Sequence, residues 1–167
     1  MKNLSLFTDG GVVGKNPSDI GGTWAWVLVD DANEIVAHES GTIIADGHTV
    51  TNNQMELYAI LQGLTDVYDR GKAKQLKRVY SDSKVSLGRL TKGWSLNNIS
   101  AKMVRMLDEV KKNYVFSSIG GVTTVLLDGH PTKEQLVTGF GKRLHPVSKW
   151  NVLCDDLCNA EKKRFSK

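Results

Sequence analysis

Four acidic side chains stand where the sequence pattern changes, and together they could hold divalent cations. Asp9 closes a short stretch of alternating apolar and polar residues, and Asp82 directly follows a second such stretch. Glu56 comes just after a run of helix-capping residues, and Asp155 lies in a final amphipathic segment. Carboxylate oxygens suit Mg²⁺ and Mn²⁺, and two such ions about 3.5–4 Å apart promote in-line displacement at phosphate. These residue types indicate metal-dependent phosphoryl chemistry.

Three of these acids also have a simpler structural explanation. Asp9 before Gly10 could be a turn residue, and Glu56 could be a favourable charge at a helix N-terminus. Asp82 next to Ser83 could belong to an N-cap. Because all four acids fall at mutually compatible ends of predicted elements, the metal-binding interpretation is favoured.

The elements that would position these acids follow from hydrophobic periodicity. Alternation predicts strands over 4–9, 23–29 and 34–44, and two turns between three adjacent strands imply an antiparallel meander. The other predicted elements are a helix from Thr51 to near Gly71, a strand over 77–80, helices over 83–90 and 99–110, a strand over 121–127, a loop over 129–146 and a helix over 149–163 capped by Ser148.

Strands that recur after helices are expected to add in parallel to the meander. We therefore predict an α/β fold with a mixed five-stranded sheet flanked by helices, in a single domain over residues 1–167. Sites in such sheets form outside the carboxyl ends of strands, where Asp9 and Asp82 are predicted to lie.

The composition excludes several other classes of protein. Hydrophobic residues make up 40% and charged residues 24%, which is typical of a globular domain rather than a disordered or collagen-like chain. Apolar runs are too short to cross a membrane, and two cysteines are too few for a disulfide scaffold. We expect a cytoplasmic monomer with no membrane partner. The net charge of +4 mildly favours a polyanionic partner.

Four short motifs resemble those of the type 1 ribonuclease H family, and the resemblance covers nearly the whole chain. They are Phe-Thr-Asp-Gly-Gly at 7–11, Thr-Asn-Asn-Gln-Met-Glu-Leu at 51–57, Tyr-Ser-Asp-Ser at 80–83 and Cys-Asp-Asp-Leu at 154–157. The resemblance implies a ribonuclease H-like fold and an endonuclease that hydrolyses the RNA strand of RNA–DNA hybrids. It also implies two Mg²⁺ ions, with Mn²⁺ as a possible substitute, and products with 5′-phosphate and 3′-hydroxyl ends.

The resemblance assigns the metal ligands by position. Asp9 would bridge both ions, Glu56 and Asp82 would complete one site, and Asp155 the other. The choice of Asp155 over Asp156 rests on the register of the motif, since the apolar stripe of the helix lies nearer Asp156.

The resemblance also implies residues that contact the hybrid. Asn52 and Asn53 would lie in its minor groove, with Glu56 touching a ribose hydroxyl. Asn16 and Thr51 would contact the DNA strand, although capping alone would also explain the residues at 51–53. Trp94 would stack on a DNA sugar, with a packed or capping tryptophan as the alternative.

Two histidines match different features of the family's auxiliary histidine. His130 directly follows the fifth predicted strand, whereas His145 has the family's ten-residue distance to the last aspartate. We favour His130, which makes the loop to Pro146 a lengthened flap. Within this loop Lys142 and Arg143, near Gly139 and Gly141, could approach a phosphate.

The remaining basic stretches and the two cysteines have ordinary structural explanations. The stretches at 72–78 and 161–164 are typical of solvated faces, which could also strengthen binding to the nucleic-acid backbone. Cys154 and Cys158 are expected to be buried thiols. Two other functions remain open: a nuclease of the same fold that acts on DNA, and a non-catalytic hybrid-binding protein.

Overall fold

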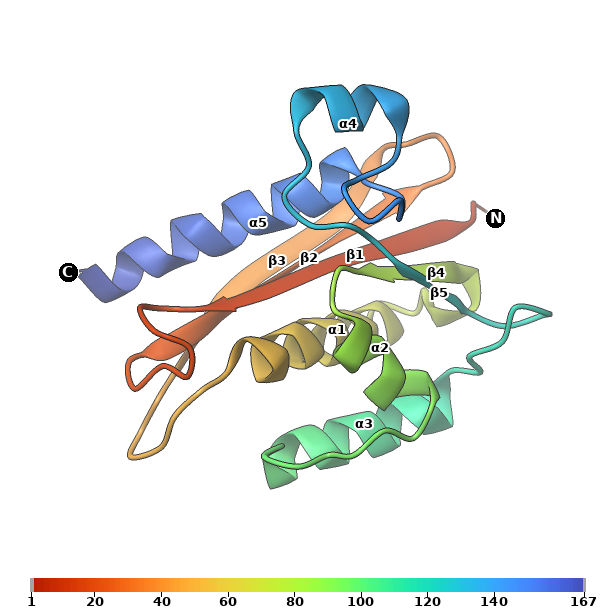
Figure 1. Cartoon of the computed structure of the whole chain (residues 1–167). Coiled ribbons are helices and arrows are strands. Elements are labelled where there is room, and N and C mark those ends of the chain that lie inside the picture. Colours follow the sequence, from red (N-terminus) through yellow and green to blue (C-terminus); the bar gives the residue numbers. More distant parts are fainter. Residues whose placement is uncertain (1, 167) are drawn as a thin grey trace.

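One mixed sheet organises the chain. The computed structural model describes residues 2–166 and orders the strands β3-β2-β1-β4-β5 (Figure 1). β1 pairs antiparallel with β2 and parallel with β4, β2 pairs antiparallel with β3, and β4 pairs parallel with β5. The strands are β1 (Leu4–Val12), β2 (Gly21–Asp30), β3 (Ile35–Ile44), β4 (Leu76–Ser81) and β5 (Thr123–Leu126). The predicted mixed five-stranded sheet is confirmed.

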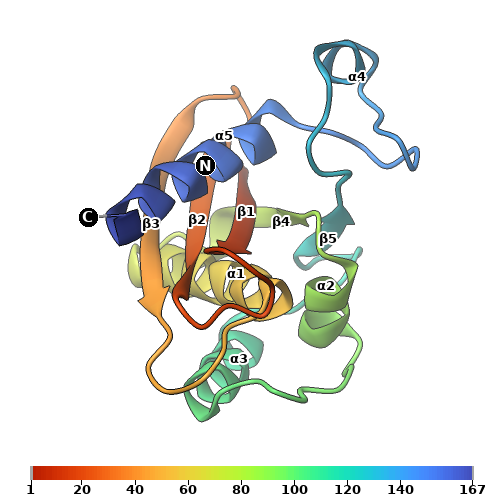
Figure 2. The same ribbon diagram turned by 60° about the vertical axis from the view of Figure 1, so that its left-hand side comes forward.

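Helices cover both faces of this sheet. Figures 1 and 2 show α1, α2 and α3 on one face and α5 on the other, while α4 stands away from the sheet. The helices are α1 (Asn52–Asp69), α2 (Lys84–Thr91), α3 (Ala101–Asn113), α4 (Lys133–Thr138) and α5 (Lys149–Lys162), with short 3₁₀ turns at Ala73–Gln75 and Lys163–Ser166. Among the described residues, none of the helices combines the length and hydrophobicity of a membrane crossing.

Alternation along the strands gives each face its own apolar cluster. Leu6 and Trp26 face the larger cluster under α1, α2 and α3. Phe7 and Val27, one position along, face a smaller cluster under α5 that contains Cys154 and Cys158. Both thiols are free and buried, as predicted. Because successive strand residues point to opposite faces, one strand supports both layers of helices.

Two of the predictions about these elements are wrong, the end of the first strand and the absence of a helix from 129–146. Asp9 does not close the first strand, because β1 keeps pairing with β2 as far as Val12. The expected loop over 129–146 contains α4, which Thr132 caps through a reciprocal bond pair with Gln135 and which ends at Gly139 in the left-handed conformation (φ 87°). A six-residue helix without buried residues leaves no hydrophobic period to detect.

Candidate active site

Three carboxylates from three different elements converge beside the sheet. Asp9 lies in β1, Glu56 in the second turn of α1, and Asp82 directly after β4. Each offers one oxygen, and these oxygens all lie within 4.8 Å of one another. The parallel pairing of β1 and β4 runs to Phe7 and Tyr80, so Asp9 and Asp82 each follow it by two residues. The sheet register thus places the two aspartates side by side.

The start of α1 is fixed by its cap. Thr51 Oγ1 accepts the backbone N–H of Gln54 (3.1 Å), and Gln54 Oε1 accepts the backbone N–H of Thr51 (2.8 Å). Met55 and Tyr58 then bury one side of the helix in the larger apolar cluster. The cap and this packing together hold Glu56 over the end of the β1–β4 pairing.

Burial and mutual repulsion disfavour the ionised form of these three carboxyl groups when no cation is bound. Burial, and next the charge of Asp82, raise the pKa of Asp9 to about 8. Burial, and next the charge of Asp9, raise the pKa of Glu56 well above its ordinary value. The pKa of Asp82 is also raised, because its burial outweighs the opposing effect of His130.

The cluster fits a divalent metal ion. Glu56 Oε2 is buried and has no hydrogen-bond partner among residues 2–166. Buried charge without a partner is costly, and a hard cation would neutralise these carboxylates through the oxygen ligands it prefers. The unpaired oxygen and the three converging carboxylates are therefore the features that a Mg²⁺ or Mn²⁺ site requires.

Asp155 reaches the same place from α5. It lines a pocket of about 220 Å³ together with Asp9, Glu56 and Asp82, whereas Asp156 is exposed. Asn151, one turn earlier on α5, is 3% exposed, and its Nδ2 donates to the carbonyl of Thr8 (3.5 Å). This bond ties the start of α5 to β1, beside Asp9.

The two candidate histidines are placed differently. His130 Nδ1 lies 3.8 Å from Asp155 Oδ2, and His130 lines the pocket that holds the four acids. His145 lines a neighbouring hollow that includes Glu56 and Asp82. Both side chains therefore lie near the acids, and His130 is the one that faces Asp155.

The residues expected to contact a hybrid lie around the start of α1, with one exception. Asn52 lines the pocket of the acids, and Asn53 lines the neighbouring hollow. Asn16 Oδ1 accepts the backbone N–H of Asn52 (3.1 Å), which places Asn16 beside Thr51 and Asn52.

Trp94 is the exception, because it lines none of these hollows. Its ring packs on Gly88 of α2, where an added Cβ atom would lie 2.1 Å from the ring. Lys92 Nζ lies 5.6 Å from the ring centroid, and the side chain remains 38% exposed. This packing against α2 agrees with the alternative expectation, that of a packed tryptophan.

Lys162 is a residue of this pocket that was not predicted from the sequence. It lines the pocket of the four acids, and its Nζ would lie 3.6 Å from a Cβ atom on Gly11. The stretch at 161–164 was expected to be a solvated face. Lys162 follows Asp155 by seven residues, which is two helical turns, so helical spacing could have placed both on one face.

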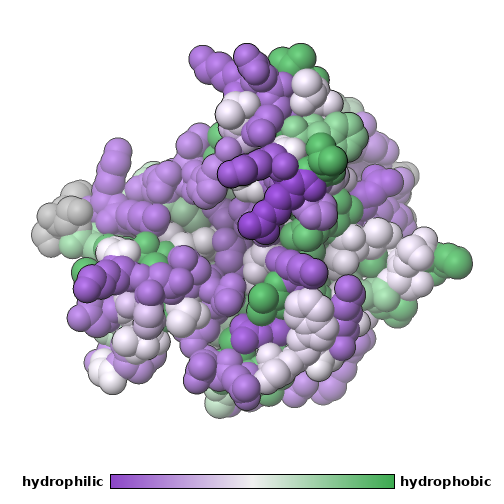
Figure 3. Space-filling view, in the orientation of Figure 1, coloured by the Kyte–Doolittle hydropathy of each residue, from purple (hydrophilic) through white to green (hydrophobic). Residues whose placement is uncertain are grey.

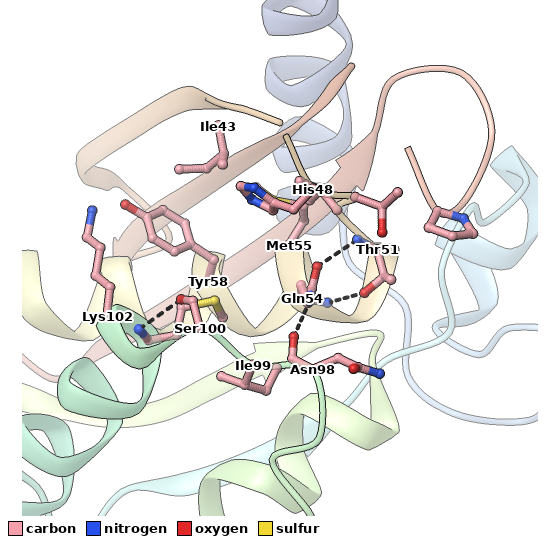
Figure 4. Close-up of a pocket in the computed structure, with 14 residues that line it drawn as sticks. Ile43, His48, Thr51, Gln54, Met55, Tyr58, Asn98, Ile99, Ser100 and Lys102 are labelled. Carbon is pink, nitrogen blue, oxygen red and sulfur yellow. Dashed lines mark hydrogen bonds between the residues drawn. The ribbon is translucent and has the colours of Figure 1, made fainter. Parts of the chain in front are cut away.

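A separate apolar pocket of about 550 Å³ lies between α1 and the start of α3 (Figure 4). Ile43, Met55 and Ile99 give it an apolar lining, and Gln54 Nε2 donates to the carbonyl of Asn98 at its edge (Figure 4). Among the described residues that line this pocket, none carries a carboxylate. It therefore takes no part in metal binding by the acidic cluster.

Comparison with known proteins agrees with the geometry. A ribonuclease H from Syntrophomonas wolfei is 29% identical over 159 residues, which is 94% of each chain. The crystal structure of RNase H1 from the archaeon Halobacterium salinarum has a TM-score of 0.62 at 22% identity and covers 97% of this chain and 98% of its own. LC11-RNase H1, isolated from compost and crystallised with an RNA/DNA hybrid, has a TM-score of 0.67 at 18% identity and covers 99% of this chain and 100% of its own. The model of the RNase H family matches residues 1–160, and this chain belongs to that family.

Proposed function

We propose that this chain is an endoribonuclease that cuts the RNA strand of RNA–DNA hybrids with two divalent cations and leaves 5′-phosphate and 3′-hydroxyl ends. As a member of the RNase H family, the chain is a metal-dependent nuclease. The observation that carries the proposal is the convergence of Asp9, Glu56 and Asp82 within 4.8 Å, with Asp155 lining the same pocket. The hybrid bound to LC11-RNase H1, a protein of the same fold, supports the choice of substrate.

The four acids would share the two metal ions. Asp9, Glu56 and Asp82 would hold one ion, and Asp9 and Asp155 would hold the other. Such ions, when bound, activate the attacking water and stabilise the leaving oxygen, and Mg²⁺ or Mn²⁺ suits this set of oxygen ligands. Asp9 and Glu56 are buried, and Asp82 and Asp155 are half-buried. Burial of the first two lowers the local dielectric and strengthens their attraction for a cation.

The chain's own polar groups would select RNA over DNA. A 2′-hydroxyl can both donate and accept hydrogen bonds, and its presence is what distinguishes RNA from DNA at a given position. Asn52 lines the acidic pocket, Asn53 lines the neighbouring hollow, and both residues are exposed, so their amides can meet both needs. Asn16 and Thr51 lie on the adjoining side of this helix start, where they would face the DNA strand.

His130 would act on protons during hydrolysis. Its ring is exposed and lies beside Asp155, with Nδ1 3.8 Å from the carboxylate oxygen. From there the imidazole can take a proton from water, or give one to a product, and exchange it with solvent.

We also propose that residues 1–167 form one catalytic domain that acts as a monomer. All five strands join a single sheet, and both apolar clusters are built on it. One chain supplies all four acids to the pocket.

The decisive experiment is incubation of the protein with a hybrid labelled on either strand, with and without Mg²⁺. We expect metal-dependent cutting of the RNA strand alone, with products that carry a 5′-phosphate. Asp9→Asn should keep the fold, by circular dichroism, and lose nearly all cleavage. Equal cutting of an all-DNA duplex would point to a DNA nuclease, and binding without product would point to a hybrid-binding protein.

A further inference from the structure

A second hollow, of about 610 Å³, adjoins the acidic pocket and is rich in basic side chains. We call it the basic hollow. Glu56 and Asp82 line one part of it, so the hollow and the acidic pocket are continuous. Its basic lining comes from three separate segments and consists of Lys84, His130, Lys142, Arg143 and His145. Figure 3 shows strongly hydrophilic residues directly below α4, beside more hydrophobic ones.

The segment that carries three of these basic residues is anchored by Asp128. This carboxylate is 9% exposed, and its Oδ2 accepts the backbone N–H groups of Arg143 (2.8 Å) and His145 (3.1 Å). The backbone N–H of Asp128 donates to the carbonyl of Pro146 (2.9 Å). An added Cβ atom on Gly141 would lie 2.4 Å from Cβ of Asp128, so the two segments are in close contact. The chain after α4 is thereby folded back against the hollow.

The side chains of Lys84, Lys142 and Arg143 have no acidic partner among the residues that the structure describes. Of the acids that face the hollow, Glu56 and Asp82 belong to the metal-binding cluster. Asp128 already accepts two backbone N–H groups through one of its oxygens. The far part of the hollow is therefore suited to an external anion.

We propose that the basic hollow binds a second phosphate group of the RNA strand, beside the one that is cut. This inference rests on the proposed function, because the acidic pocket must hold the scissile phosphate. Arginine offers a planar pair of donors to phosphate oxygens and lysine a point charge, so both suit this ligand. The phosphate is either an internal backbone phosphodiester or a terminal monophosphate, and the same side chains could bind both.

Binding to the full chain tests this without cleavage. In an Asp9→Asn background with Mg²⁺, the double variant Lys142→Ala/Arg143→Ala is compared with its parent on one hybrid. We expect roughly tenfold weaker binding near 0.1 M salt, and a salt dependence whose slope falls by about one to two units. Lys84→Ala, on α2, tests the hollow from another element and should weaken binding in the same direction. Lys133→Ala, an exposed lysine on α4 that does not line the hollow, is the matched control and should bind like the parent.

Replacing single phosphates of the RNA strand by uncharged linkages shows which phosphate the basic hollow binds. A set of hybrids, each with one uncharged methylphosphonate in the RNA strand, should contain one that weakens binding to the parent but has no effect on the double variant. If the effect instead appears on removing a 5′-terminal phosphate, the source is a strand end. Either result supports the proposal.

Separate readouts distinguish failure of this inference from failure of the proposed function. Unchanged affinity and salt slope in the double variant would overturn the inference, even if the wild-type protein cuts the hybrid. If the wild type does not cut the hybrid, the proposed function fails, and failure of the parent to bind the hybrid would overturn both.

Discussion

Gly10 and Glu56 are so close that a Cβ atom on Gly10 would lie 2.6 Å from the backbone nitrogen of Glu56. The same atom would lie 2.4 Å from the carbonyl carbon and oxygen of Met55. Both neighbours are backbone, so neither can move aside without shifting the helix. The absence of a side chain at Gly10 thus sets how closely α1 approaches β1, and with it the separation of Glu56 from Asp9.

Replacement of this glycine should therefore damage the site as well as the fold. We expect Gly10→Ala to lower the free energy of unfolding by roughly 1–3 kcal/mol and to reduce hybrid cleavage at least tenfold under conditions where the protein remains folded. Gly11→Ala is the matched control, because its added Cβ atom would make only ordinary van der Waals contacts, 3.6 Å from Lys162 Nζ and 3.8 Å from Thr23 Oγ1. Urea denaturation and cleavage rates measure the two effects. Wild-type values for Gly10→Ala would refute the close-contact argument.

The two adjacent aspartates of α5 should differ sharply in importance. Asp155 lines the pocket of the acids, and Asp156 is exposed on another side of the helix. We expect Asp155→Asn to reduce cleavage by about two orders of magnitude or more, through loss of a metal ligand. Asp156→Asn should cut at nearly the wild-type rate. The reverse order in a metal-dependent cleavage assay would show that the register of this motif is off by one residue.

Much of the fold could be predicted because its signals are local. Strand alternation around Leu6 and Trp26 and the capping run at Thr51 each depend on neighbouring residues, and the structure contains the elements they predict. The grouping of Asp9 with Asp82 also followed, since parallel neighbours end at one edge of a sheet. The resemblance, not the periodicity, supplied the choice of Asp155.

Other features depend on contacts that no local pattern encodes. Asp128 reads as an ordinary loop residue, yet it holds a segment 15 and 17 residues further along the chain. The apolar pattern of α5 predicted its helical form but did not show that Lys162 reaches the acidic pocket. Such details arise when separate segments fold against each other, and they are where the structure added most to the site.

Replacing His130 and replacing His145 should affect different steps, cleavage in the first case and hybrid binding in the second. His130 faces Asp155 and lines both the acidic pocket and the basic hollow. We expect His130→Ala to lower the cleavage rate constant roughly tenfold to a hundredfold, a larger effect than its effect on hybrid binding. His145→Ala should mainly weaken binding, since His145 lines the basic hollow and not the acidic pocket. Single-turnover cleavage and equilibrium binding, measured across pH 5.5–8.5, would distinguish the two effects. A larger loss of rate constant in His145→Ala would reassign the auxiliary histidine.

The stability of the metal-free protein should depend on pH through the acidic cluster. The pKa of Asp9 is raised from 3.8 to about 8, so between these pH values the folded chain retains a proton that the unfolded chain has released. Unfolding then releases a proton, and rising pH destabilises the fold. With metal removed by EDTA, we expect Asp9→Asn to be more stable than the wild type at pH 8 by roughly 2–4 kcal/mol, and about equally stable near pH 4.

Urea denaturation at several pH values measures this difference. Excess Mg²⁺ should remove most of the stability difference between Asp9→Asn and the wild type at pH 8, because a bound cation stabilises the ionised carboxylates and with them the folded state. Equal stability of the two metal-free proteins at pH 8 would show that the carboxylates do not repel one another as their positions indicate.

Asp128 should control the order of the segment after α4. Asp128→Ala removes the acceptor of two backbone N–H groups, those of Arg143 and His145, and each lost bond costs about 1–3 kcal/mol locally. Because the segment is mostly exposed, we expect the global unfolding transition to change little while amide exchange at residues 139–147 speeds up at least tenfold. Asp128→Asn keeps an oxygen at the same position and should restore much of the protection.

If this anchoring also shapes the basic hollow, Asp128→Ala should weaken hybrid binding in the direction of the Lys142→Ala/Arg143→Ala variant, although both cations remain. Combining the two changes should then give less than the sum of their separate effects, because residues that act through one contact are not additive. Full additivity would mean that the carboxylate and the cations act independently, and that the position of Lys142 and Arg143 does not depend on Asp128.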